Sequence, residues 1–471
     1  MKSEKIHDAI GEVRDEYIVD ANKSPSDDRA RWLRIAAVAA CILLAAAAAV
    51  FGIRGIIKSE TVPISTELTE AAPVRPVFTA SVNLLSGYSR QSTEEPGVSD
   101  ALRDACSDFS FEMFRRISDS TEDGNVLVSP LSAYYCLALA ANGADGETKA
   151  ELEKTLGLSI ADLNRQLYAY EKALPFSEKQ KLTLANSLWF RDIDGLEMEE
   201  TYLQTLVDWY DTGVYAEPFD SETARRINEW CSNYTDGMIP EIMSGTPNEE
   251  DMIFLLNAVA FRSVWAKEYR EDDIEEKTFR NADGSSKTVP MMQSWESVYL
   301  KDDSAIGVVR PYRYGEFLFA ALLPLDDNAD IYEFAASLTA EKWKNLWQNR
   351  VQGAEVRTTI PEFSAEEDYL LTDTVKAMGI QKLFSEDADL TKMAHSTAAP
   401  FCASAIRQKT YLKLNREGTE AAASTIINVT GAGAEYSEPA VRKVVKLDRP
   451  FVYLILCNDV PVFIGVTASL K

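Results

Sequence analysis

Histidine is nearly absent from this chain of 471 residues, which has only two, His7 and His395. Ser-His-Asp and Cys-His catalytic devices use a histidine as the general base, so His395 would have to act alone in the C-terminal part of the chain. The sequence also lacks a G-x-S-x-G elbow, a phosphate-binding loop and an H-E-x-x-H zinc helix. We therefore expect no enzymatic activity, and a hydrolase that depends on His395 is the weaker alternative.

Basic residues are scarce relative to acidic ones. The chain has 48 Lys and Arg against 74 Asp and Glu, a formal net charge of −26 and a pI of about 4.6. Binding to a nucleic-acid backbone needs a basic surface that displaces counterions from phosphates. The charge balance therefore argues against nucleic acid as a partner.

Cysteine provides neither a disulfide framework nor a metal site. Apart from Cys41 in an apolar run, five cysteines remain, an odd number without C-x-x-C spacing: Cys106, Cys136, Cys231, Cys402 and Cys457. Metal binding would need a cluster of ligands that the sequence does not show, so we expect no metal and no cofactor. Cys136 and Cys457 lie in apolar segments, which predicts that both are small buried side chains.

One apolar run is long enough to cross a bilayer. From Ile35 to Ile53 the chain has 19 uncharged residues, which a helix would extend over about 28 Å. Arg29, Arg31 and Arg34 precede it, so the positive-inside rule places the N-terminus in the cytoplasm. We predict four parts: a cytoplasmic leader (1–34), a transmembrane anchor (35–57), a proline-containing extracytoplasmic linker (58–79) and a folded domain (80–471) outside the cytoplasm or the cell.

A cleavable signal peptide is the alternative for this run, but its charged leader would be 34 residues long. Residues 38–41 resemble a lipoprotein cleavage box, yet only five apolar residues precede Ala40 and the run continues beyond Cys41. We interpret that box as chance and favour an uncleaved anchor. Later release of the domain by cleavage stays open.

Residues 409–430 have the pattern of a β-strand that continues through Gly418 into a second strand-forming run of small side chains. No proline occurs from Gly418 to Glu438, so no backbone N–H is missing from a ladder, and Gly418 can act as a hinge. The run is a candidate for an unused strand that could later join a sheet. An ordinary edge hairpin with an alanine-rich tip is the alternative. Alternate residues form an inward face of Thr419, Ala421, Ala423, Thr425, Ile427 and Val429 and an outward face of Glu420, Ala422, Ser424, Ile426, Asn428 and Thr430.

Short motifs elsewhere in the chain occur in the order and spacing of one protein family. They are Ser129 to Ser132 with Asn142 to Ala144, Leu255 to Ala258 with Phe261 and Trp265, Pro361 to Phe363, Met378 with Gly379, Ala388 to Leu390, Asp448 to Phe451, and Gly465. Together with the segment after Gly418, they resemble the serpins over residues 80–471. The resemblance implies one α+β domain of serpin fold, with three β-sheets, about eight to nine helices and an exposed reactive-centre loop. With the anchor, the chain resembles a bacterial, membrane-anchored serpin of the inhibitory type.

In serpins of that type, a serine protease attacks a carbonyl of the exposed loop and forms an acyl-enzyme. The loop then inserts into the main sheet as a new central strand, which distorts the protease so that deacylation stalls. The resemblance therefore implies a monomeric inhibitor that forms a covalent complex with a serine protease. A non-inhibitory serpin that serves as a binding protein or chaperone is the alternative.

Aligning Gly418 with the family's hinge glycine implies a reactive bond between Ala432 and Gly433. The small, uncharged residues before this bond suit an elastase-like protease. The segment from Gly418 to Pro450 is about seven residues longer than is usual in the family, so Ala434 and Tyr436 stay open as the attacked residue, and Tyr436 would suit a chymotrypsin-like protease. The implied hinge consists of Gly418, Thr419, Glu420, Ala421, Ala422, Ala423, Ser424 and Thr425.

The chain departs from the family pattern at two positions. Arg416 stands where inhibitory serpins usually have a glutamate, which is expected to alter a salt bridge at the start of the hinge. Gln408 stands where many members have a histidine in the sheet-opening region, beside Ser129 and Asn257. Because an amide both donates and accepts hydrogen bonds but does not titrate, we expect a working sheet-opening region without a histidine's response to pH.

Overall fold

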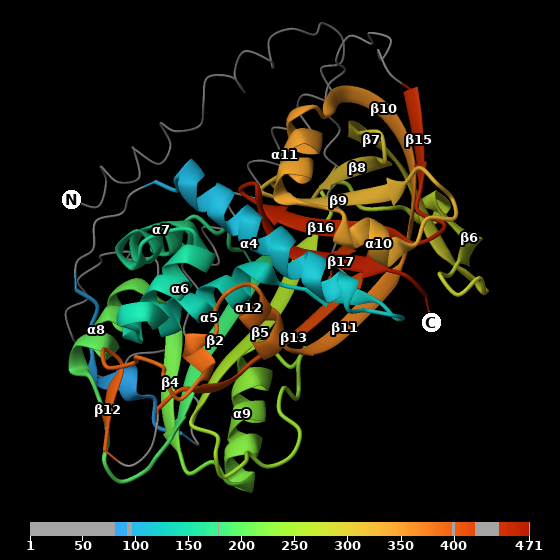
Figure 1. The fold of residues 1–471 in the computed structure, drawn as a ribbon. Helices are drawn as coiled ribbons and strands as arrows, with labels where there is room; N and C mark the ends of the chain where they lie inside the picture. Colours follow the sequence, from blue (N-terminus) through green and yellow to red (C-terminus); the bar gives the residue numbers. More distant parts are fainter. Residues whose placement is uncertain (1–80, 92–96, 178, 398–400, 420–441, 471) are drawn as a thin grey trace, which may run out of the picture. The chain divides into compact units, whose positions relative to one another are not determined.

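The computed structural model describes residues 81–91, 97–177, 179–397, 401–419 and 442–470, whose arrangement is shown in Figure 1. These residues form nine α-helices and three β-sheets, which confirms the predicted α+β class. None of the helices in these ranges is both long and apolar enough to span a bilayer. The predicted leader, anchor and linker lie outside the described residues.

The helices begin at residues that satisfy their free N–H groups. Ser99, Asp145, Ser159 and Thr339 each accept a hydrogen bond from the first turn of the helix that follows. The α-helices are α4 (Asp100–Asp119), α5 (Pro130–Gly143), α6 (Gly146–Leu156), α7 (Ile160–Lys172), α8 (Glu200–Trp209), α9 (Ser221–Tyr234), α10 (Ile331–Ala336), α11 (Ala340–Gln348) and α12 (Thr372–Ala377). Three 3-10 turns are η2 (Leu84–Gly87), η3 (Glu271–Asp273) and η4 (Lys382–Phe384).

The largest sheet has nine strands and forms the upper part of Figure 1. Its order is β1 (Val126–Val128), β17 (Val460–Thr467), β16 (Phe451–Cys457), β9 (Phe317–Pro324), β8 (Ala305–Pro311), β7 (Ser286–Lys301), β10 (Val351–Pro361) and β15 (Arg442–Lys446), and β6 (Ile274–Arg280) also pairs with β7. All its pairings are antiparallel except that of β10 with β15.

The second sheet has six strands and carries the candidate site. Its order is β11 (Phe363–Leu370), β13 (Ala403–Leu414), β14 (Gly418–Thr419), β5 (Ile253–Val264), β2 (Gln180–Arg191) and β4 (Thr212–Glu217), with an additional pairing between β13 and β5. A two-stranded sheet joins β12 (Ala394–Ser396) to β3 (Leu196–Met198).

The main hydrophobic core lies between the two larger sheets and the helices. Helix α5 is apolar and buried on nearly every side, and it contacts β17 of one sheet and β5 and β2 of the other. Cys136 in α5 and Cys457 at the end of β16 are fully buried, as predicted. A smaller apolar cluster lies on the other face of the six-stranded sheet and includes residues of α9.

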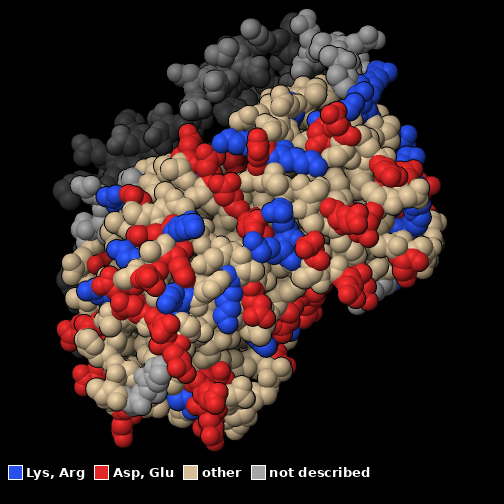
Figure 2. Space-filling view, viewed as in Figure 1, with Lys and Arg blue, Asp and Glu red and all other residues tan. Residues whose placement is uncertain are grey.

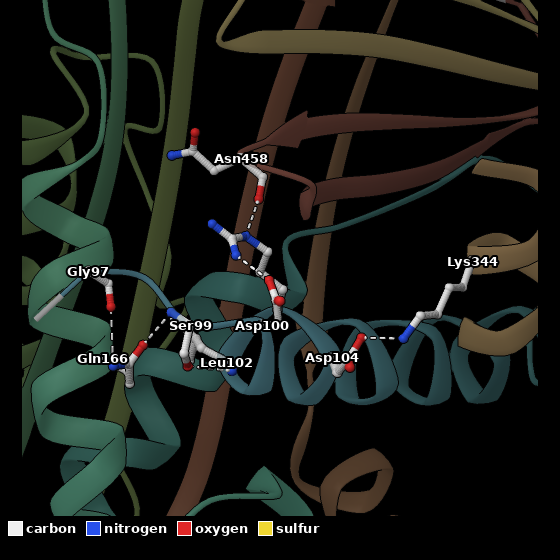
Figure 3. A network of polar contacts seen from close by, with 9 residues as sticks. Gly97, Ser99, Asp100, Leu102, Asp104, Gln166, Lys344 and Asn458 are labelled. Atoms are coloured by element: carbon white, nitrogen blue, oxygen red, sulfur yellow. Dashed lines mark hydrogen bonds and ion pairs between the residues drawn. The ribbon is translucent and has the colours of Figure 1, made fainter. Parts of the chain in front are cut away.

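Polar contacts tie the long helix α4 to its neighbours, as Figure 3 shows. Arg103 donates from Nε to the carbonyl of Asn458, in the β16–β17 turn, at 3.3 Å. Lys344 of α11 forms an exposed ion pair with Asp104 at 2.7 Å. Acidic side chains are spread over the face shown in Figure 2, in keeping with the strongly negative net charge.

Candidate functional site

The chain reverses direction between β13 and β14. Strand β13 ends at Leu414, and the Asn415 side chain accepts hydrogen bonds from the N–H groups of Glu417 (2.9 Å) and Gly418 (3.1 Å), which builds a tight turn. The predicted strand running straight through Gly418 is therefore wrong at this point. The edge-hairpin alternative is correct in the reversal but not in the edge, because β14 lies between β13 and β5, and its alanine-rich tip lies outside the described residues.

Gly418 occupies a position that only glycine can fill. Its φ is 156°, and a Cβ atom there would lie 2.0 Å from the carbonyl oxygen of Ser263 and 2.6 Å from the Cα of Val264. A side chain at residue 418 would therefore collide with the backbone of β5. The glycine allows the hinge to enter the sheet alongside that strand.

Thr419 is fully buried and faces the core, as the alternation predicts. It pairs with Leu414 on one side and Ser263 on the other. Its hydroxyl shares a 2.5 Å hydrogen bond with the hydroxyl of Tyr312, and burial raises the pKa of Tyr312 well above its usual range. Tyr312 therefore keeps its proton at physiological pH, and its hydroxyl fixes the position of Thr419 through this hydrogen bond.

A stack of aromatic rings and one arginine supports this contact. Trp265 stacks on Tyr312 with ring centroids 4.3 Å apart, and its indole N–H donates to the carbonyl of Asn415 at 2.9 Å. The guanidinium of Arg310 lies 4.9 Å from the Trp265 ring and 4.1 Å from the Tyr269 ring. Arg310 is buried and forms an ion pair with the buried Glu296. The side chains that contact the hinge are thus held in place by ring stacking and by a buried ion pair.

Arg416 forms an ion pair with Glu362. Its Nε lies 3.2 Å from Oε1 of Glu362, and its backbone N–H donates to the same oxygen. The departure from the family glutamate at this position therefore places an ion pair between the turn before the hinge and the residue preceding β11. Arg416 is about half exposed, so this pair is screened by solvent.

Below the hinge, β13 and β5 pair directly. This seam is a parallel ladder of seven residue pairs, from Ala403 with Ile253 to Thr410 with Val259. Above it, the two residues of β14 stand between the same strands. Strands β13 and β5 are therefore separated by β14 at the end of the sheet near the hinge, and they pair directly with each other from Thr410 back toward the start of β13.

Ser129, Asn257 and Gln408 meet under the seam, all three fully buried. The Gln408 side chain accepts from the N–H of Ser129 at 2.9 Å and donates to the Ser129 carbonyl and to Oδ1 of Asn257, each at 2.8 Å. Asn257 donates in turn to Oδ1 of Asn186 at 2.7 Å and to the hydroxyl of Ser132. Every member of this polar cluster is neutral, so it links β13, β5, β2 and α5 without a titratable group.

Sequence reasoning missed several members of the site. Asn186 and Tyr312 carry no local signal, because their roles arise only when distant strands meet. Ser132 lies in the Ser-Pro-Leu-Ser motif and its pairing could have been suspected from that. The remaining predicted positions lie outside the described residues: Glu420, Ala421, Ala422, Ala423, Ser424, Thr425, Ala432, Gly433, Ala434 and Tyr436.

His395 lies at the surface, in β12. Its side chain is 69% exposed, and its Nε2 is 2.9 Å from Oε1 of Glu199. Within the described ranges, no group of three or more His, Cys, Asp or Glu side chains could hold a metal ion.

Comparisons with known proteins agree with this geometry. A family model described as "Serpin (serine protease inhibitor)" matches residues 104–469. Leukocyte elastase inhibitor A of Mus musculus is 30% identical over 380 residues, covering 77% of this chain and 97% of the mouse protein. Human neuroserpin is 28% identical over 371 residues, covering 75% of this chain and 87% of neuroserpin.

Two solved structures of one thermophilic serpin, tengpin, also match. The native form has a TM-score of 0.77 at 36% identity, covering 83% of this chain and all of tengpin. The latent form has a TM-score of 0.69 at 34% identity, covering 80% of this chain and all of that structure. The backbone is thus more similar to the native form of that protein than to the latent one.

The neutral cluster at Gln408 predicts a pH effect for one substitution. In Gln408→His, burial disfavours the imidazolium and depresses the folded-state pKa below the unfolded value of about 6.5. The unfolded state then binds more protons below that pH, and the variant loses up to about 1.4 kcal/mol of stability per pH unit as pH falls. Thermal unfolding at pH 8, 7, 6 and 5 should show a midpoint that falls relative to the original protein below pH 6.5.

Gln352→His is the matched control, because Gln352 is exposed on β10. Its midpoint should follow that of the original protein at every pH. A Gln408→His variant that also does so would contradict a buried, dry cluster at the seam.

Proposed function

Because the chain belongs to the serpin family, we propose that it inhibits serine proteases as a suicide substrate, by loop cleavage, acyl-enzyme trapping and insertion of the loop into the six-stranded sheet. Serpins are protease inhibitors and in general not enzymes. One observation carries the proposal: the first two hinge residues, Gly418 and Thr419, already lie between β13 and β5. The sheet is thus open at the place and in the direction that an incoming strand requires.

The register of β14 specifies where the rest of the strand would go. Continuing the pairs of Thr419 with Leu414 and Ser263 places Thr425 between Gln408 and Asn257. Those two side chains are bonded to each other at 2.8 Å, so insertion must separate them. The Thr425 hydroxyl would then lie where it can bond to either amide.

Insertion would exchange one ladder for two. The seven parallel pairs of the seam would break, and an antiparallel strand would bond to β13 and β5 on both sides. The inward residues after Thr419 are Ala421, Ala423 and Thr425, which are small enough to enter a narrow gap beside the core. Each added residue gains hydrogen bonds worth about 0.5–1.5 kcal/mol net. This gain favours insertion of the loop, which has to be completed before the acyl-enzyme is hydrolysed.

Elastase-like serine proteases are the proposed targets, because residues 429–432 before the proposed bond are small and uncharged. The name of the mouse relative is consistent with this choice. Cleavage after Ala434 or Tyr436 remains the alternative assignment of the bond. A non-inhibitory binding protein or chaperone is the second function in this family, and the small, proline-free run after Gly418 argues against it.

Mixing the protein with pancreatic elastase tests the inhibitory function. We expect a covalent complex that survives denaturing electrophoresis, and a released peptide beginning at Gly433 by mass spectrometry. Thr419→Arg should be cleaved but yield at least about tenfold less complex, because residue 419 is already buried beside Tyr312 and an unpaired arginine would be expelled from that position, so that the strand no longer begins inside the sheet.

Glu420→Arg is the matched control, since it adds the same side chain on the outward face. It should form the complex at nearly the original yield. Cleavage without any complex in the unmodified protein would favour the non-inhibitory alternative, and equal yields from both variants would contradict insertion with Thr419 inward.

We also propose that residues 35–57 anchor the domain to a bacterial membrane, with residues 80–471 outside the cytoplasm. The support is the uncharged run from Ile35 to Ile53 and the arginines before it. Expressed in bacteria, the full chain should sediment with membranes and its domain should be digested by protease added to spheroplasts. Recovery of the full chain in the soluble cytoplasmic fraction would contradict the anchor.

A further inference from the structure

A cavity of about 510 Å³ lies beside the side chains that support the hinge. It is lined by residues of the segment 267–273, which follows β5, and by side chains of β7, β8 and β10, the strands labelled in the upper part of Figure 1. Small-molecule sites in proteins have volumes of roughly 300–1,000 Å³. The cavity is therefore large enough to hold a small organic ligand.

Arg310 supplies an unused hydrogen-bond donor to this cavity. Its side chain lines the cavity and is only 5% exposed. One terminal nitrogen is paired with Glu296 and the other donates to the carbonyl of Lys267, but Nε has no hydrogen-bond partner among the residues that the structure describes. A buried donor without an acceptor is unfavourable, so a ligand atom that accepts from Nε would be stabilised there.

The charges at the mouth of the cavity are balanced. Arg270 and Asp273 form an ion pair with each other, with Nε 3.2 Å from the carboxylate. Two cations, Lys267 and Arg357, and two carboxylates, Glu268 and Asp272, make up the remaining charged lining there. The mouth therefore has no strong preference for either sign of charge, and the buried donor of Arg310 determines which ligand group the inner end accepts.

Two aromatic side chains line the same cavity. Tyr269 is buried, and its ring lies 4.1 Å from the guanidinium of Arg310. Trp295 is 61% exposed, although it is a large apolar side chain, and it stands directly opposite Arg357 in the pairing of β7 with β10. An exposed indole at the mouth of a cavity provides a surface on which a planar ring can pack.

We propose that this cavity binds a small aromatic carboxylate. The carboxylate accepts a hydrogen bond from Nε of Arg310, and the aromatic ring packs against Trp295. The ligand thus uses a buried donor and an exposed indole that have no role in the proposed inhibition. Because the N–H of Tyr269 donates to the carbonyl of Arg416 at 3.2 Å, the bound ligand would contact a wall that also holds the turn before the hinge.

Titration calorimetry of the full chain in detergent tests this site. The probe is indole-3-acetate, its neutral counterpart is indole-3-acetamide, and the heats of adding each to protein-free detergent are subtracted. We expect saturable binding of the acid to one site. The acid should bind at least about tenfold more tightly than the amide, the effect of a hydrogen bond between two charged groups.

Two variants locate the ligand within the cavity. Trp295→Ala should weaken the binding of the acid and of the amide at least about threefold, by removing the ring on which both pack. Arg310→Lys keeps a cation beside Glu296 but has no Nε donor, so it should reduce the preference for the acid over the amide.

Tyr314→Ala is the matched control for Trp295→Ala, because Tyr314 is 66% exposed and does not line the cavity. Its affinity for both compounds should equal that of the original protein.

Four results would overturn this inference: no saturable binding at millimolar concentrations of the acid, equal affinities for the acid and the amide, equal affinities in the Trp295 and Tyr314 variants, or an unchanged preference for the acid in Arg310→Lys. None of them depends on whether the chain forms a complex with a protease. The ligand site and the proposed function can therefore fail separately.

Discussion

Seven residue pairs hold β13 directly against β5, while two residues of β14 separate the same strands at the top of the sheet. The rest of the candidate site is arranged around this contrast. The aromatic stack of Trp265 and Tyr312 fixes the entering residues, and the amides of Gln408 and Asn257 close the sheet below them. A parallel ladder is slightly less stable than the antiparallel pairs that would replace it, so the proposed insertion would make the closed seam a metastable arrangement.

The two ends of the seam use different chemistry. At the hinge, the buried pair of Arg310 and Glu296 needs its geometry intact, because either charge alone would be costly to bury. Under the seam, the cluster is neutral, and its hydrogen bonds keep the same strength across physiological pH. This division places a charged, buried support beside Gly418 and Thr419 and a neutral set of amides at the position that the strand would pass in the proposed insertion.

Much of this could be predicted from the sequence, because period-two alternation and short motifs are local signals. The alternation after Gly418 placed Thr419 inward, and Ser129, Asn257 and Gln408 were identified together through the resemblance to a family. The reversal at Asn415 was missed because an Asx turn inside a strand-like run has only a weak signal. Tyr312 and Asn186 act through partners far away in the chain, which no local pattern encodes.

The central claim is that the folded domain relaxes when its loop becomes a strand between β13 and β5. The most direct measurement is the thermal unfolding midpoint of the protein before and after a single cut within residues 420–441, made with a protease that is then inactivated. The account predicts that the cut protein melts well above the intact one, because the freed segment replaces one ladder of the sheet with two. A cut protein that melts at or below the midpoint of the intact protein would contradict it.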